Sequence, residues 1–363
     1  MNKDSFSILK PRTGRTLYEQ ADDLLEQLHE VCRDGKHDLS TLLQVRVYVS
    51  DAANQCEALR AHELIKQLMP AGVCGFVEQP PLDGAKLAVS LWFLDERVIR
   101  REVFRLPHGM LAEIHTEKLT YLYHTVRFDK ESENQTSEEQ TRKAFELHIE
   151  QLRQRGLTLR EHCLRTWIFV RDVDRHYAGV VKARNEVFAL HGLTSQTHYI
   201  ASTGIGGAGE WSEALVSMDF LSVEGLQTDN VGFLHAPEYL NPTHEYGVAF
   251  ERGTYFDLPG SRCFLISGTA SIDKYGACVH RGDVITQAGR LFLNIGQLLA
   301  SGGGTLSDAG FFIVYLRDVS DRMAVDEYMR LRFPHVPYLL TEARVCRPEW
   351  LIEVECVAVQ TLK

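Results

Sequence analysis

The pattern of apolar and polar positions along this chain is written three times. Short runs rich in β-branched or aromatic residues, at 47–51 (VYVSD), 168–172 (IFVRD) and 314–318 (VYLRD), each end on an aspartate. Apolar residues at helical spacing precede each run, and a second helical stretch and an apolar strand follow it. This order of elements predicts one α/β module in three copies.

A glutamine on the first helix of each copy sets the register of the repeat. It lies 31 or 32 positions before the aspartate, in the pairs Gln20 with Asp51, Gln140 with Asp172, and Gln287 with Asp318. We therefore expect three modules, at 1–105, 106–225 and 226–363, each within the usual size of a domain.

Local signals place the ends of several helices. Thr16 and Glu19 have the spacing of a capping box, and Ser137 and Gln140 repeat it in the second copy. In the third copy, Asp283 or the residue before it begins a helix. Residues 204–209 satisfy the GxGxxG pattern, but no clear helical pattern follows, so we interpret them as a loop at a cleft rather than as a nucleotide site.

Composition narrows the class of protein. Hydrophobic residues make up 44% of the chain and charged residues 24%, as in a globular protein, and the net charge of −10 with no basic run argues against nucleic acid or anionic membrane as a partner. The first residues have no apolar signal core and no apolar run spans a bilayer, so we expect a cytoplasmic protein. Eight cysteines without a CxxC pair are expected to be free thiols, and no metal site is expected.

The motifs of the third copy resemble those of the YjgF/RidA superfamily. They are residues 266–270 (ISGTA), 282–284 (GDV) with Gln287, 314–318, and 353–355 (EVE), and the other copies carry degenerate versions. Members of this family are trimers of a βαβ-type fold with ligand sites between subunits. The resemblance implies an α/β (α+β) chain of three tandem modules that form an intramolecular pseudo-trimer, either monomeric or a small homo-oligomer.

Within that superfamily, residues 164–358 resemble the chorismatases, which hydrolyse chorismate to pyruvate and a ring product. The matching stretches are 165–167 (RTW), 202–206 (STGIG), 250–254 (FERGT) and 266–270, with Cys346 seven positions before Glu353. Gly268 and Cys346 are the residue types of the hydroxybenzoate-forming branch. The resemblance implies a small carboxylate substrate and no metal or organic cofactor.

The arginines that these families use to hold a carboxylate are missing at the matching positions. Chorismatases carry one on the helix after the third run, predicted here at 320–332, where this chain has Glu327 with Arg330 nearly one turn later. Chorismatases also have Pro-Arg after a Tyr-Gly pair, where Tyr246 and its neighbour are followed by Val-Ala. Imine deaminases place an arginine two residues after a proline, but Leu339 holds that position here.

Glu353 is the strongest catalytic candidate. On a strand it shares one face with Glu355, about 7 Å away, and two such close carboxylates raise one another's pKa, as suits a general acid. The alternative from strand alternation alone is a solvated face. The family resemblance favours a catalytic Glu353 and leaves Glu355 undecided.

The remaining candidates follow from the same motifs. Cys346 is a second catalytic candidate, because the neighbouring Arg347 could favour a thiolate, although a lone cysteine is more often a buried apolar residue. The predicted substrate-binding residues are Gly268, Thr269, Arg165, Tyr246, Arg252 and Arg317. For each of the three arginines, a structural ion pair is an equal alternative.

Three functions stay open at this point. The first is chorismatase-like hydrolysis of the enolpyruvyl ether of chorismate or a related carboxylate, in one competent cleft dominated by the third module. The second is hydrolysis of an imine or enamine, and the third is binding of a metabolite without catalysis.

Overall fold

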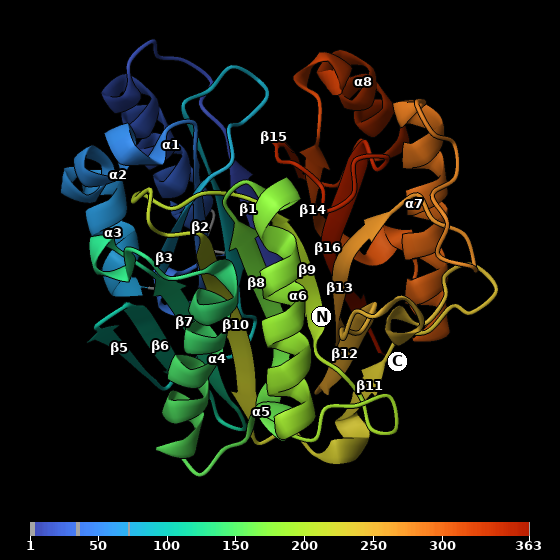
Figure 1. Ribbon diagram of the computed structural model, residues 1–363. Coiled ribbons are helices and arrows are strands. Elements are labelled where there is room, and N and C mark those ends of the chain that lie inside the picture. Colours follow the sequence, from blue (N-terminus) through green and yellow to red (C-terminus); the bar gives the residue numbers. More distant parts are fainter. Residues whose placement is uncertain (1–3, 34–36, 72, 363) are drawn as a thin grey trace.

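Three separate β-sheets, each with its own helices, make up the molecule (Figure 1). The computed structural model describes the chain except residues 1–3, 34–36, 72 and 363. The first sheet has the order β1-β4-β2-β3. Its elements are β1 (Ser5–Leu9), α1 (Leu17–Arg33), β2 (Leu42–Val49), α2 (Ala52–Ala61), α3 (Glu63–Ala71), β3 (Cys74–Glu78) and β4 (Leu87–Phe93).

The second and third sheets repeat this order and add two strands at one edge. The second sheet is ordered β5-β6-β7-β10-β8-β9, and the third β11-β12-β13-β16-β14-β15. The second holds β5 (Arg100–Leu106), β6 (Gly109–His115), β7 (Thr120–Arg127), α4 (Ser137–Arg153), α5 (Leu159–His162), β8 (Cys163–Val170), α6 (Val173–Leu190), β9 (Ala201–Gly206) and β10 (Val216–Glu224). The third holds β11 (Val231–Phe233), β12 (Gly253–Leu258), β13 (Ser261–Ala270), α7 (Val284–Ser301), β14 (Ala309–Leu316), α8 (Arg322–Arg332), β15 (Tyr338–Glu342) and β16 (Ile352–Thr361).

The pairing of strands confirms that one module occurs three times. In each sheet the last long strand, β4, β10 or β16, pairs antiparallel on both sides, and the middle strand pairs parallel with a short edge strand, β3, β9 or β15. The molecule is therefore a mixed α+β chain of three tandem modules, as the repeat predicts. The exact division of the chain at 105 and 225 stays a proposal.

The repeated glutamine has the same structural task in each module. Its side-chain oxygen accepts a hydrogen bond from the backbone N–H just before the last strand, in the pairs Gln20 with Lys86 at 2.8 Å, Gln140 with Leu215 at 2.9 Å, and Gln287 with Leu351 at 2.9 Å. All three glutamines are buried. The glutamine thus joins the first helix to the start of the last strand. Because the last strand pairs with the middle strand, the position of the glutamine relative to the middle strand is the same in each module.

Two of the three predicted helix caps are confirmed. Thr16 and Glu19 exchange hydrogen bonds as a capping box, and the Asp283 carboxylate accepts from the N–H of Thr286. The second predicted box is wrong by one residue, because Thr136 and Glu139 form it. Gln140 instead turns inward to reach the last strand.

Helices cover the outer face of each sheet, and the inner faces pack against one another (Figure 1). One continuous apolar cluster contains buried residues of all three modules, such as Tyr48, Trp167 and Val357. This arrangement agrees with the predicted pseudo-trimer. Within the described residues, no helix is both long and apolar enough to cross a membrane.

Buried charges join the three modules at the centre. Arg46 of β2 forms ion pairs with Asp219 of β10 at 3.0 Å and with Glu355 of β16 at 3.3 Å. Arg165 of β8 binds the other oxygen of Glu355 at 3.0 Å. All four side chains are at most 4% exposed. We call these four residues the central ion network.

Candidate active site

A cavity of about 350 Å³ lies where the second module meets the third. Helix α6 and strand β9 form one wall, and strands β13 and β16 form the other. The loop before β12 and residues 346–350 close its sides with aromatic side chains, among them Tyr246, Phe250 and Trp350. The size is that of a site for a small molecule.

Glu353 of β16 reaches this cavity from the centre of the sheet. Its side chain is 4% exposed and forms no hydrogen bond or ion pair with any described residue. Burial raises the pKa of Glu353 to about 8, and the charge of Glu355 adds to the rise. The carboxyl group is therefore mainly protonated at neutral pH, as a proton donor must be.

Gly268 of β13 leaves the room that Glu353 occupies. A Cβ atom added at Gly268 would lie 2.0 Å from Oε1 of Glu353. The Gly268 N–H donates to Oγ1 of Thr203 at 3.0 Å, which holds this backbone against β9. Any side chain at position 268 would thus displace the carboxyl group.

We expect Gly268→Ala to lower kcat by about 100-fold, because a shift of the acid by about 1 Å costs that much in a positioned site. The free energy of unfolding should fall by less than about 3 kcal/mol, since the clashing atom ends a side chain that can move. Steady-state kinetics with chemical denaturation measures both. Gly289→Ala on α7 is the control, because its Cβ would meet nothing within 4 Å. Unchanged kcat in Gly268→Ala would show that position 268 does not place the acid.

Three arginines line the same cavity without a carboxylate partner among the described residues. Arg184 of α6 is 1% exposed, and its Nε and Nη2 have no hydrogen-bond partner in the described part of the chain. Arg252 donates through Nη2 to the carbonyl oxygen of Asn241, and its Nε has no partner. Arg347 lies over the rings of Tyr246 and Trp350. Buried donors of this kind are costly unless an anion binds them.

The sequence did not identify Arg184, because the family resemblance places the carboxylate-binding arginine on the helix at 320–332 and Arg184 lies on α6. Glu327 lies exposed on α8, which does not line the cavity. The cavity forms between modules, so its helix comes from the second module. Arg184 follows Asp172 by 12 positions, as Arg330 follows Asp318. The repeat, together with an arginine on the apolar face of a predicted helix, could have identified it.

The structure separates the remaining predicted site residues into two groups. Gly268, Tyr246, Arg252, Cys346 and Glu353 line the cavity. Arg165, Thr269 and Arg317 do not line it.

The residues outside the cavity have structural contacts. Arg165 belongs to the central ion network, and the Thr269 hydroxyl donates to the carbonyl oxygen of Ser267. Arg317 donates to the carbonyl oxygen of Val345 and pairs with Asp174 at 2.8 Å. It therefore holds the segment that carries Cys346 against the start of α6.

The structure changes two expectations, one about the thiol of Cys346 and one about the strand face that carries Glu353 and Glu355. Burial raises the pKa of Cys346 to about 12, so this cysteine is a thiol and Arg347 does not make it a thiolate. The face that carries Glu353 and Glu355 is buried between modules and not solvated, and the ion pairs of Glu355 give it a structural role.

The glycine pattern at 204–209 lies beside the cavity but is not a nucleotide site. Its first three residues end strand β9, contrary to the loop interpretation, and the next regular element is strand β10. A Cβ at Gly204 would lie 2.9 Å from the ring of Tyr177, which packs on the same wall. In the described part of the chain, the one cluster with metal-ligand geometry is Glu102, Glu113 and His115 on the β5-β6 hairpin, outside this cavity.

Comparison with known proteins gives two findings. No model of a known protein family matches the chain. It is 31% identical over 99 residues to 3-aminoacrylate deaminase RutC of Acinetobacter baylyi, an alignment that covers 26% of this chain and 75% of that protein. The crystal structure of a chorismatase superposes on 98% of both chains with a TM-score of 0.70 and 18% identity, so the two share the fold along their whole length.

Proposed function

This chain belongs to the YjgF/RidA superfamily, and on that premise we propose that it hydrolyses the enolpyruvyl ether of chorismate or of a related dicarboxylate. The observation that carries the proposal is a buried, protonated Glu353 that shares one cavity with three arginines that have no carboxylate partner among the described residues. The shared fold with a chorismatase supports it.

The arginines would bind the substrate through its carboxylates. Among the described residues, Arg184 and Arg252 offer unpartnered N–H groups from two different elements of the cavity, one from α6 and one from the loop before β12. A guanidinium group binds a carboxylate through two parallel hydrogen bonds. Aromatic side chains on the cavity walls complement an apolar ring between the two charged ends.

Glu353 would supply the proton that begins the reaction. An enol ether is hydrolysed when its terminal CH₂ carbon takes a proton, which leaves a cation on the ether carbon. Water adds to that carbon and loses its own proton to the Glu353 carboxylate, and the resulting hemiketal releases pyruvate and the ring alcohol. A carboxyl group with a pKa of about 8 can donate at neutral pH and accept in return.

We expect the intact protein to release pyruvate from chorismate, and Arg184→Gln to lower kcat/KM by about 10- to 100-fold, because one charge-assisted contact is lost. A coupled assay of pyruvate measures both. Arg330→Gln is the matched control, since Arg330 is the repeat equivalent of Arg184 but lies exposed on α8, paired with Asp326. No release of pyruvate, or equal effects of the two variants, would contradict the proposal.

A second candidate function is hydrolysis of an imine or enamine, which the name of the RutC relative favours. The same arginines could hold the carboxylate of such a substrate, so the missing arginine after Pro337 does not exclude it. Loss of 2-iminobutanoate or 3-aminoacrylate faster than in buffer, with chorismate left intact, would favour this function. Thermal stabilisation by chorismate without turnover would instead favour a binding protein.

A further inference from the structure

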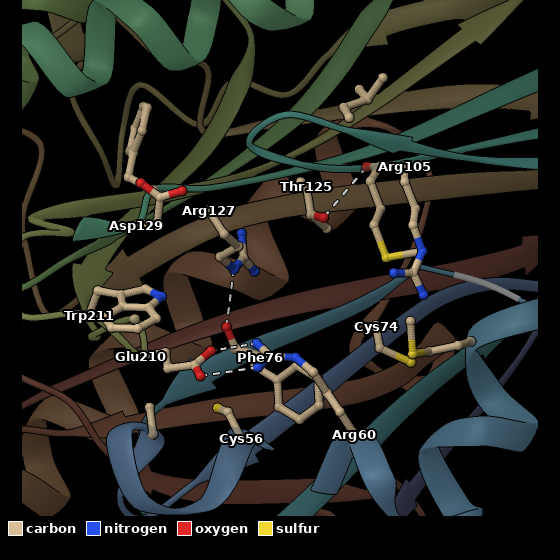
Figure 2. A pocket seen from close by; sticks show the side chains of 17 residues that line it. Cys56, Arg60, Cys74, Phe76, Arg105, Thr125, Arg127, Asp129, Glu210 and Trp211 are labelled. Atoms are coloured by element: carbon tan, nitrogen blue, oxygen red, sulfur yellow. Dashed lines mark hydrogen bonds and ion pairs between the residues drawn. The ribbon is translucent and has the colours of Figure 1, made fainter. Parts of the chain in front are cut away.

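A second and larger cavity, of about 560 Å³, lies between the first and second modules (Figure 2). Helix α2 and strand β3 of the first module face strand β7 of the second. These are the repeat equivalents of α6, β9 and β13 around Glu353. At the third junction, between α8 and β15 of the third module and Leu82 of the first, lies a cavity of about 30 Å³, too small for a metabolite.

The second cavity has no counterpart of the catalytic acid. Glu353 pairs across the sheet with Tyr315, and the equivalent position in the second module is Ser217, which pairs with Phe169. Ser217 cannot donate a proton as a carboxylic acid does. The cavity therefore suits binding and not the chemistry of the Glu353 cavity.

Two of the three arginines that line the second cavity form ion pairs with carboxylates. Arg60 pairs through both terminal nitrogens with Glu210, and Arg127 lies 2.8 Å from Asp219 and donates to the backbone of Phe76. In Figure 2, dashed lines join Arg60 to Glu210 and Arg127 to Phe76.

Arg105 is the exception. Arg105 lines the cavity from β5, where its backbone pairs with that of Met110. Arg105 is exposed and its side chain forms no ion pair or hydrogen bond with the described residues, and Figure 2 shows its guanidinium directed toward the side that holds Cys74. The remaining carboxylate in the wall, Asp129, lies on the opposite side and accepts from the N–H of Glu131. One cation is thus left for a ligand.

The rest of the wall is apolar or uncharged. Phe76, Phe128 and Trp211 supply aromatic surface, and Trp211 is 42% exposed. Burial raises the pKa of both Cys56 and Cys74 to about 12, so they stay neutral thiols. This combination fits a flat apolar molecule with a single negative charge.

We propose that this cavity binds a small aromatic monocarboxylate, with the carboxylate on Arg105 and the ring against Phe76, which lies between Arg105 and Trp211 in Figure 2. The Glu353 cavity has three arginines that pair with no carboxylate of the described residues, and it selects a more highly charged ligand. The two cavities therefore differ in the charge of the molecule that each takes. This inference does not depend on the proposed reaction.

Calorimetric titration of the intact chain with benzoate tests the proposal. All titrations use the Arg184→Gln background, which weakens anion binding in the Glu353 cavity. We expect saturable binding in that background, and a Kd at least tenfold weaker when Arg105→Gln is added, because a charge-assisted contact is lost. Arg105→Lys should recover part of the affinity, and Phe76→Leu should weaken binding.

Arg100→Gln is the matched control, an exposed arginine of the same hairpin that is paired with Glu102. It should leave the Kd unchanged. Absence of binding at millimolar benzoate in the Arg184→Gln background would overturn the proposal. So would a Kd that Arg105→Gln leaves unchanged, or that Arg100→Gln weakens equally. Because the readout is binding and not turnover, failure of the proposed reaction would leave this result unaffected.

Discussion

Glu353→Gln should lower kcat for pyruvate release by about 10²- to 10⁴-fold, the range that a positioned general acid contributes. The amide keeps the shape of the side chain but has no acidic proton. KM should change little, because the arginines and not Glu353 would hold the carboxylates. Steady-state kinetics of the coupled assay measures both constants.

The pH dependence of the wild-type protein provides an independent test of the same acid. The pKa of Glu353 is raised to about 8, so the donor is present below that pH and kcat should fall as pH rises through about 8. A raised pKa also means that the protonated group stabilises the fold at low pH and that this contribution is lost as pH rises through the folded pKa. Above pH 8, Glu353→Gln should therefore be more stable than the wild type.

Ser217→Ala is the control for Glu353→Gln, because Ser217 holds the equivalent position in the second module and its hydroxyl has no hydrogen-bond partner within the described ranges. It should leave kcat unchanged. A wild-type kcat that stays flat from pH 6 to 9, or a Glu353→Gln variant with normal kcat, would exclude Glu353 as the proton donor.

Arg46→Met should destabilise the protein by about 3 kcal/mol or more, because it removes one partner of a buried ion network. Arg46 is 2% exposed and contacts carboxylates from both other modules, Asp219 and Glu355. Each carboxylate keeps one arginine, Arg127 or Arg165, so the loss should lie at the lower end of the usual range. Urea denaturation followed by circular dichroism measures the change.

The matched control for Arg46→Met is Arg60→Met, which removes another ion pair between the first and second modules. The pair of Arg60 with Glu210 is partly exposed, so its loss should cost less than about 1 kcal/mol. Equal costs for the two variants would show that the central network does not hold the modules together. In a double-mutant cycle, Arg46→Met and Asp219→Asn should be strongly non-additive.

The parts of the structure that sequence reasoning predicted are those with a local signal. The middle strands, the first helices and the constant glutamine recur at a fixed spacing, and that spacing follows from the hydrogen bond that each glutamine makes. The short parallel strands β3 and β15 escaped prediction. Each has five residues and pairs on one side with a distant segment, so no local pattern marks it.

The sequence predicted the site residues that belong to a single module, but not those that a neighbouring module contributes. Glu353, Gly268 and Cys346 belong to the third module and were found together. Arg184 belongs to the second, so its place in the cavity depends on how two modules dock. The same limit explains why the sequence left the role of Glu355 undecided. A carboxylate on a strand has the same sequence pattern whether it contacts a substrate or, as here, pairs with Arg46 and Arg165 of the other modules.

The unequal size and chemistry of the three junctions have a consequence for mutation and design. In an assembly of three identical subunits, every substitution appears in every cleft at once. Here a covalent chain encodes each cleft with different residues, so each can be altered alone. A designer could reshape the walls around Arg105 for a new ligand while Glu353 and Arg184 stay as they are.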